Sequence, residues 1–390
     1  MISLLVVIYV VFISLGLPDS LFGVAWPVVH TDFSIDESFA SIYSIITGVC
    51  TGGVSFVSGK LIRKFGTAKV TFFSTILTAL GLLGISFSGN IVVMMIFSVI
   101  LGYGAGAIDT GLNNFVSLHY KAQHMNWLHC FWGIGVTLSP IIMSKFLSGE
   151  SGSWRSGYRV VTLIQLIIAA FVLFFIPKWQ KIEKSVKSSS EEIKNASNAK
   201  FTDILKIKGV ISGILSLGLY CSMEFLLGTW GASYIVNVFS FSPDMAAKWV
   251  SLYYGGIMLG RVVSGFVSMS LSDKWLIRIG ICVSFVGILF LYLPFANISL
   301  FGLLLIGFGF GPIFPSVLHS VPERFGSTFS ADITGYHMGG AYAIGFSVQL
   351  IYGFIATATT FKITAFILTA LSICLFAANE FTINKTKKIK

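Results

Sequence analysis

The chain has 390 residues, of which 55% are hydrophobic and only 11% are charged, and its formal net charge is +10. A soluble domain has about 25% charged residues, because its surface must be hydrated. The composition therefore excludes an ordinary soluble enzyme or binding module and indicates a protein that crosses a membrane many times. We predict no nucleic-acid partner, since no folded soluble domain is left to carry a basic face.

Apolar segments long enough to cross a bilayer follow one another along nearly the whole chain. A membrane span needs about 20 apolar residues, and it must be helical because lipid cannot satisfy exposed backbone groups. We therefore predict an all-α membrane protein with twelve transmembrane helices. The predicted spans are residues 2–29, 38–58, 68–88, 91–117, 125–148, 159–177, 207–238, 246–270, 275–296, 298–320, 330–357 and 361–379.

The spans divide into two halves of six, residues 1–177 and 207–379. Residues 178–206 are polar and of low complexity, which predicts a cytoplasmic linker, and residues 380–390 form a basic tail. Of the 26 Lys and Arg residues, 20 lie in this linker, in the tail and in the loops that follow even-numbered spans. Because cytoplasmic loops carry the excess of Lys and Arg, we expect a multi-pass cell-membrane protein with both termini in the cytoplasm.

The two halves contain related segments in the same order. Asp19-x-x-x-Gly23 in the first span corresponds to Glu224-x-x-x-Gly228 in the seventh, and a Gly-rich run at 102–109 corresponds to one at 307–314. A parallel repeat of six spans describes the major facilitator fold, in which substrate binds near mid-membrane between the halves. The glycines also form faces of small residues, for which close helix packing is the simpler explanation.

Four ionisable residues of the predicted spans are hard to place in lipid: Asp19, Asp109, Glu224 and Arg261. A charged side chain at the bilayer centre costs about 2.5–3.5 kcal/mol on insertion scales. Such groups must face a wet cavity, pair with one another or be protonated. A carboxyl group that is removed from water favours its neutral form, so the three acids are candidate proton carriers. The alternative for Arg261 and Glu224 is a buried ion pair that only steadies the helices.

Amides, imidazoles and indoles in the spans form a candidate substrate site. Aromatic rings pack on the apolar C–H faces of a sugar, while amides, imidazoles and carboxylates bind its hydroxyl groups. Interhelical hydrogen bonds and membrane-interface tryptophans are the alternative interpretation. The candidate substrate-binding residues are Asp19, Trp26, Asn113, Asn126, His129, Trp132, Gln165, Trp230, His337 and Gln349.

Motifs for other chemistry are missing from the sequence. The five cysteines lie in apolar spans without metal-ligand spacing, so we expect no metal site and no cofactor. The sequence also lacks HExxH, GxSxG, P-loop and dinucleotide fingerprints, so we do not expect an enzyme. Transport energy would then come from an ion gradient or from the substrate itself.

Several stretches resemble known transporters. Residues 59–66, after the second span, resemble the major facilitator loop signature G-x-L-x-D-R-x-G, although Arg63 stands where an acid is expected. The acid in span 1, the Gly-rich span 4 that ends in an acid, and the segments 126–135, 254–261 and 309–315 resemble the fucose–galactose–glucose:proton symporter family.

This resemblance implies proton-coupled uptake of a monosaccharide. It assigns the proton site to Asp109 and links Asp19 to sugar binding. The chain departs from the fucose permease pattern in two ways. Asp109 replaces a glutamate, and Glu224 adds a third acid.

Other functions remain open on the sequence alone. A proton-driven exporter of drugs or metabolites would have the same fold, but its cavity is usually more apolar than the amides and histidines predict here. A membrane receptor would not need three titratable acids. Sodium could replace the proton, since clustered carboxylates and amides also bind it. We expect a monomer, as is common for this fold.

Overall fold

The computed structural model describes residues 2–120, 122–147, 153–187, 201–326 and 330–386, and this part of the chain is helical without a strand. The helices of the first half are α1 (Ile2–Asp19), α2 (Leu21–Asp32), α3 (Phe39–Phe65), α4 (Thr67–Ser86), α5 (Ile91–His119), α6 (Ala122–Leu147) and α7 (Trp154–Lys187). Those of the second half are α8 (Phe201–Leu205), α9 (Val210–Phe239), α10 (Pro243–Val267), α11 (Asp273–Phe290), α12 (Ala296–Phe310), α13 (Ile313–His319), α14 (Val321–Phe325), α15 (Ser330–Ala358) and α16 (Thr364–Thr386).

The helices match the predicted membrane spans. Within the described residues, ten helical segments are long and apolar enough to cross a bilayer. Helix α3, whose apolar part covers Phe39–Ser55, and helix α11, which has charged residues in its first turns, complete the predicted set. Two spans are each built from two helices, α1 with α2 and α12 with α13. The predicted all-α membrane fold is confirmed.

Two helices continue past their predicted ends. Helix α7 ends at Lys187 instead of residue 177, and α16 ends at Thr386 instead of residue 379. The added residues are polar and basic, and a helix does not have to stop where the hydrocarbon stops. Much of the predicted linker, residues 188–200, and the last part of the tail, residues 387–390, lie outside the described residues.

The first span is broken in its middle. Helix α1 ends at Asp19, directly after Pro18, and α2 begins at Leu21. Proline has no N–H to donate, so it interrupts the helical hydrogen bonds. Between the two helices, the Ser20 hydroxyl donates to the carbonyl oxygen of Val136 on α6 at 2.8 Å. The break therefore places a carboxyl group at a helix end in the interior of the protein.

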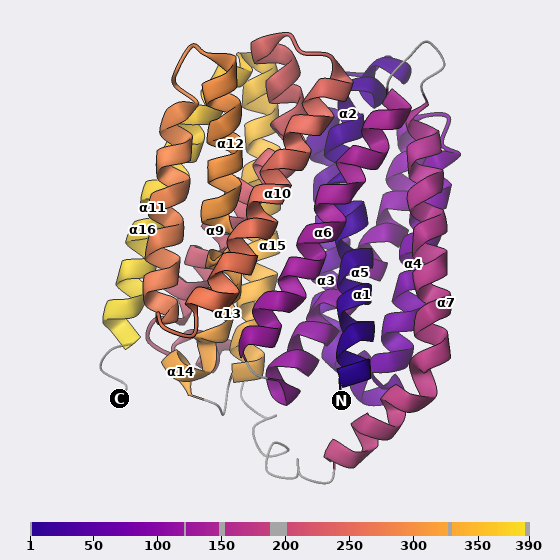
Figure 1. Ribbon diagram of the computed structural model, residues 1–390, viewed down its shortest axis with the longest axis vertical. Coiled ribbons are helices and arrows are strands. Elements are labelled where there is room, and N and C mark those ends of the chain that lie inside the picture. The colour runs from indigo at the N-terminus through magenta and orange to yellow at the C-terminus, as the bar shows by residue number, and fades with distance from the viewer. Residues whose placement is uncertain (1, 121, 148–152, 188–200, 327–329, 387–390) are drawn as a thin grey trace.

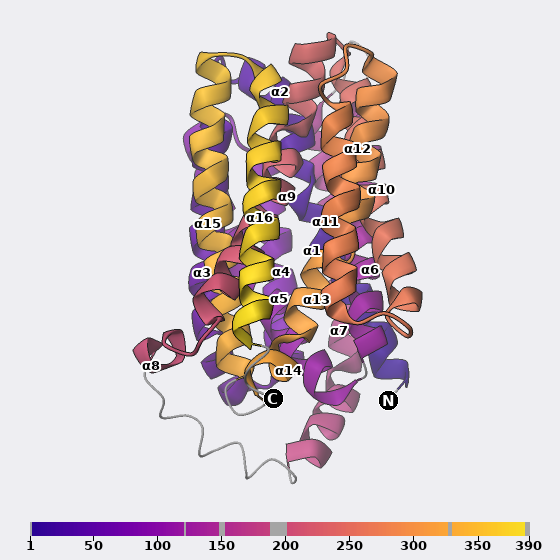
Figure 2. The ribbon, with the colours of Figure 1, turned by 90° about the vertical axis from the view of Figure 1, so that its left-hand side faces the viewer.

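The two halves stand side by side, and both termini lie at the same end of the molecule (Figures 1 and 2). Across the interface, α2 packs against α9, α3 against α15, and α6 against α10. The broken first span and the interface helices enclose the space between the halves.

The repeat glycines of the two halves contact each other. A Cβ on Gly23 would lie 2.1 Å from the carbonyl oxygen of Gly228, so the backbones of α2 and α9 touch at this point. We call this pair, Gly23 and Gly228, the roof contact. Gly23 lies nine residues before the end of α2, and Gly228 lies eleven before the end of α9. At about 1.5 Å per residue, the roof contact is nearer to the face opposite the termini.

Candidate functional site

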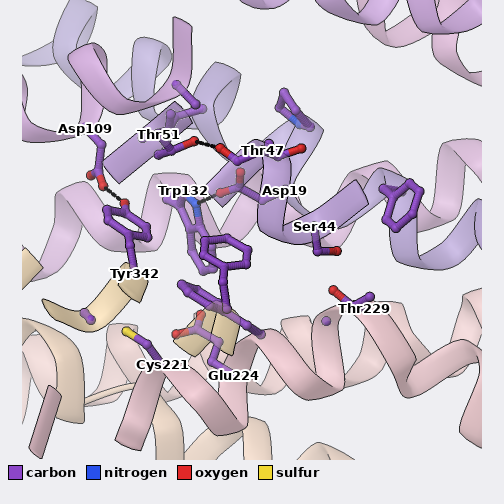
Figure 3. A pocket seen from close by; sticks show the side chains of 18 of the residues that line it. Asp19, Ser44, Thr47, Thr51, Asp109, Trp132, Cys221, Glu224, Thr229 and Tyr342 are labelled. Atoms are coloured by element: carbon purple, nitrogen blue, oxygen red, sulfur yellow. Dashed lines mark hydrogen bonds between the residues drawn. The ribbon is translucent and has the colours of Figure 1, made fainter. Parts of the chain in front are cut away.

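A cavity of about 190 Å³ lies between the two halves, on the termini side of the roof contact. It is lined by α1, α2, α3, α5 and α6 from the first half and by α9, α10, α13 and α15 from the second. Polar and ionisable side chains project into it from both halves (Figure 3). The ionisable groups and the amide are Asp19, Asp109, His129, Cys221, Glu224, Arg261 and Gln349.

Asp19, the last residue of α1, lines the cavity. The indole N–H of Trp132 on α6 donates to its Oδ2 atom at 2.7 Å. The break after α1 thus places the carboxyl group where an indole of the same half can hold it. The Trp132 ring lines the cavity beside it.

Asp109 receives hydrogen bonds on both carboxylate oxygens. The Tyr342 hydroxyl of α15 donates to Oδ2 at 2.5 Å (Figure 3). The Asn113 amide donates to Oδ1 at 2.7 Å. Asn113 lies one turn further along α5 and does not itself line the cavity. Its amide oxygen accepts from His129 Nε2 at 3.1 Å, which extends the network to α6.

Arg261 and Glu224 face each other in the second half. Their closest N···O distance is 3.9 Å, and the two side chains are 2% and 8% exposed. The guanidinium also lies 4.3 Å from the ring centroid of Trp132 and donates to the carbonyl oxygen of His129 at 3.2 Å. Arg261 therefore contacts both Glu224 of its own half and Trp132 of the other half.

Removing either partner of this buried pair is expected to destabilise the protein more than removing both. Arg261→Met leaves Glu224 buried without its cation, which costs about 3–5 kcal/mol for a broken buried pair. The double variant Arg261→Met/Glu224→Gln removes both charges and should restore much of the lost stability. Thermal unfolding of purified Arg261→Met, Glu224→Gln and the double variant measures this, and additive losses would contradict the pairing.

Besides Asn113, four predicted substrate-binding residues with described side chains do not line the cavity. Trp26 and Trp230 are 0% exposed and lie just beyond the roof contact, where the halves touch. The indole of Trp26 donates to the carbonyl oxygen of Glu37 at 2.8 Å, and Trp230 packs against the rings of Tyr352 and Phe361.

Gln165 and His337 are the other two. The Gln165 amide donates to the carbonyl oxygen of Ser14 at 2.5 Å, which fastens α7 to α1 inside the first half. His337 is 1% exposed, and its Nδ1 atom donates to the carbonyl oxygen of Ile333 in its own helix at 2.8 Å. Both side chains are held by interhelical or local bonds, which was the alternative interpretation for such residues.

The last two predicted residues are Gln349 and Asn126. Gln349 lines the cavity, and its amide donates to the Thr229 hydroxyl at 2.5 Å. Asn126 lies in α6, but its side chain is outside the described part of the structure.

Hydroxyl groups in the cavity were missed by the sequence interpretation. Ser44, Thr47 and Thr51 lie on one face of α3 at spacings of three and four residues. Ser44 faces Thr229 of α9 across the cavity (Figure 3). The helical spacing of these residues in the second predicted span could have indicated a polar face. No comparable signal marked Tyr342, whose partner is 233 residues away in the sequence.

An aromatic wall is present, formed by Trp132, which was predicted for the site, and by Phe22 and Tyr43, which were not. Phe22 and Tyr43 stack with their ring centroids 3.7 Å apart, and both line the cavity. Trp26 packs behind Phe22 at a centroid distance of 5.0 Å. With Trp132, these rings give the cavity apolar faces beside its polar groups.

Among the described residues, no group of three or more His, Cys, Asp or Glu side chains is arranged to hold a metal ion. The groups that are present can bind hydroxyls, exchange a proton with water and pair a charge.

A polar cavity at the interface of two related six-helix halves defines the class of this protein, a multi-pass membrane transporter and not an enzyme. The sequence profile of the Major Facilitator Superfamily matches residues 8–350. The chain therefore belongs to that superfamily.

Similar proteins include characterised transporters. The glucose/mannose transporter GlcP of Bacillus subtilis (strain 168) is 23% identical over 332 residues, which cover 82% of this chain and 81% of that protein. The structure of the proton:xylose symporter XylE superposes with a TM-score of 0.78 at 13% identity, covering 98% of this chain and 95% of that one. The transporter FucP in its outward conformation gives a TM-score of 0.70 at 14% identity, covering 97% and 98%. At these identities the structures show the shared fold.

Proposed function

We propose that this protein is a secondary active transporter that moves a monosaccharide together with protons by alternating access. The observation that supports this most directly is the cavity itself. It brings three carboxyl groups and one guanidinium together with hydroxyls, an amide and aromatic rings, between two halves that can rock.

The chemistry of the lining favours a sugar. Rings of Phe22, Tyr43 and Trp132 offer apolar faces, while Ser44 and Gln349 offer groups for hydroxyls. The volume of about 190 Å³ is below the roughly 300–1,000 Å³ of pockets for drug-sized ligands. This supports a small polar solute over the exporter alternative.

The acids favour coupling to protons. Asp109 would be the proton carrier, because it lies at the interface with a hydrogen-bonding partner from each half. Asp19 would connect coupling to sugar binding, because Trp132 both holds its carboxylate and lines the cavity. Glu224, paired with Arg261, would tune the charge of the cavity.

The similar proteins support the same proposal. Their names describe transport of glucose and mannose in one case and of xylose with protons in another. The bias of Lys and Arg supports a cytoplasmic location for both termini. The roof contact would then lie between the cavity and the outside of the cell.

Transport can be tested in proteoliposomes with a pH-sensitive dye in the external buffer. Addition of D-glucose, D-mannose, D-galactose or L-fucose outside should raise the external pH, because protons enter with the sugar. Protein-free liposomes give the background, and sodium-free buffer separates proton from sodium coupling. If folded protein moves protons with none of these sugars but expels cationic or amphipathic compounds, the exporter alternative replaces this proposal.

A further inference from the structure

Two hydrogen bonds join the halves on the termini side of the cavity, among the described residues. Arg261 of α10 donates to the carbonyl oxygen of His129 on α6, and Tyr342 of α15 donates to Asp109 of α5. Asp109 lies ten residues before the end of α5, and Tyr342 lies twelve residues after the start of α15. Both are therefore roughly 15–18 Å from the termini-side ends of their helices. The halves cannot part on this side unless both bonds break.

Only one of these bonds has an acceptor that can gain a proton. The acceptor of Arg261 is a backbone carbonyl, whereas the acceptor of Tyr342 is the carboxyl group proposed as the proton carrier. A hydrogen bond to a carboxylate is roughly twice as strong as one between neutral groups. The strength of the contact between α15 and α5 therefore depends on whether Asp109 is protonated.

We propose that Tyr342 is the positioning residue that couples the proton to the conformational cycle, because its bond to deprotonated Asp109 closes the termini side of the empty carrier. This inference rests on the proposed function. After sugar release, Asp109 gives its proton to water on the open side and becomes a carboxylate. The carboxylate accepts the Tyr342 hydroxyl, the termini side closes, and the empty transporter returns to face the other side.

Other charged and titratable groups near Asp109 do not replace this bond. The nearby groups are Arg261, Asp19, Cys221 and, through Asn113, His129, and Glu224 lines the same cavity. Asn113 does donate to Asp109, but it lies on the same helix, so it stays in place when the halves separate. In the described contacts, Tyr342 is the donor that leaves Asp109 on opening.

The first test compares net uptake with counterflow of radiolabelled D-glucose. Net uptake requires return of the empty carrier, whereas counterflow exchanges sugar without that step. Tyr342→Phe should lower net uptake about tenfold, the loss expected for one charge-assisted bond, with counterflow within about twofold of wild type. A higher pH on the termini side should not restore net uptake, because the carboxylate of Asp109 then still lacks the hydroxyl donor.

A matched control is Tyr43→Phe. It removes a tyrosine hydroxyl that lines the same cavity but, unlike that of Tyr342, does not donate to Asp109 in the described hydrogen bonds. Any defect in sugar binding should lower net uptake and counterflow in the same proportion. If Tyr342→Phe behaves in that way too, or changes neither rate, the proposal is overturned.

A second measurement needs no sugar and therefore stands even if the proposed function fails. Cys221 lines the cavity and can report access from the termini side in a protein whose other four cysteines are replaced. At alkaline pH, a thiol reagent added on that side should modify Cys221 about tenfold faster in the Tyr342→Phe variant than in the protein that keeps Tyr342. At acid pH the two rates should converge. Equal rates at both pH values would contradict the proposal.

Discussion

Replacing Asp109 with asparagine is expected to abolish accumulation of sugar against a gradient. Asparagine has nearly the same size as aspartate and can still accept a bond from Tyr342, but it cannot carry a proton. Each pH unit across the membrane can sustain about tenfold accumulation if one proton enters with each sugar. In Asp109→Asn this ratio should fall to one, and the sugar-induced proton flux should disappear. Uptake into proteoliposomes under an imposed pH gradient measures both.

The matched control for this variant is Asp109→Glu. It keeps an ionisable group, with a reach that is longer by one methylene, and should retain accumulation. Counterflow should survive in Asp109→Asn, because exchange needs no proton release. Full accumulation by the asparagine variant would move the proton site to Asp19 or Glu224.

Adding one methyl group at the roof contact should open the transporter on the side opposite the termini. The Cβ of Gly23→Ala would lie 2.1 Å from the carbonyl oxygen of Gly228 and 2.9 Å from the Cα of Thr229. Backbone atoms cannot rotate away as a side chain can, so the two helices must separate. Because packed interfaces favour discrete arrangements over gradual deformation, we expect a population shift towards the opposite-side-open state. Net uptake should fall about tenfold or more.

Modification of Cys221 by a membrane-impermeant thiol reagent from the opposite side measures this shift. Labelling should be faster in Gly23→Ala than in the parent protein. Gly53→Ala is the control, since a Cβ at Gly53 on α3 meets no atom within 4 Å. Unchanged labelling of Gly23→Ala in a folded protein would show that the glycines do not hold this side closed.

The fold could be predicted because it follows from one strong constraint. Lipid requires helices, so the lengths of apolar segments give the number of spans. The same physics identified Asp19, Asp109, Glu224 and Arg261, since their insertion cost must be offset by a cavity or a partner. All four line the cavity of the structure.

The rotation of each helix could not be predicted in the same way. Amides and indoles are tolerated on several faces of a membrane helix, so composition does not tell a cavity residue from an interhelical bond. Gln349 lines the cavity and Gln165 does not, although both are amides in apolar spans. Trp26 and Trp230, which follow the repeat glycines, were both predicted to bind substrate, yet both are buried beyond the roof contact.

Contacts between the halves were also beyond the reach of sequence patterns. Tyr342 and Asp109 are 233 residues apart and lie in non-equivalent helices of the two halves. Nothing local to either residue marks the pair. The hydroxyls of Ser44, Thr47 and Thr51 had a visible helical spacing, but serine and threonine hydroxyls in membrane helices are commonly satisfied by their own backbone.

The roof contact has a consequence for the ancestry of the chain. Gly23 and Gly228 are equivalent positions of the repeat, and they touch each other, as equivalent residues do on the axis of a symmetric homodimer. A single six-helix unit with one such glycine would therefore close the same interface with an identical copy of itself. The two acids one turn away have different partners: Asp19 is held by an indole, while Glu224 faces a guanidinium. Joined in one chain, equivalent positions became free to diverge in charge without breaking the contact that they flank.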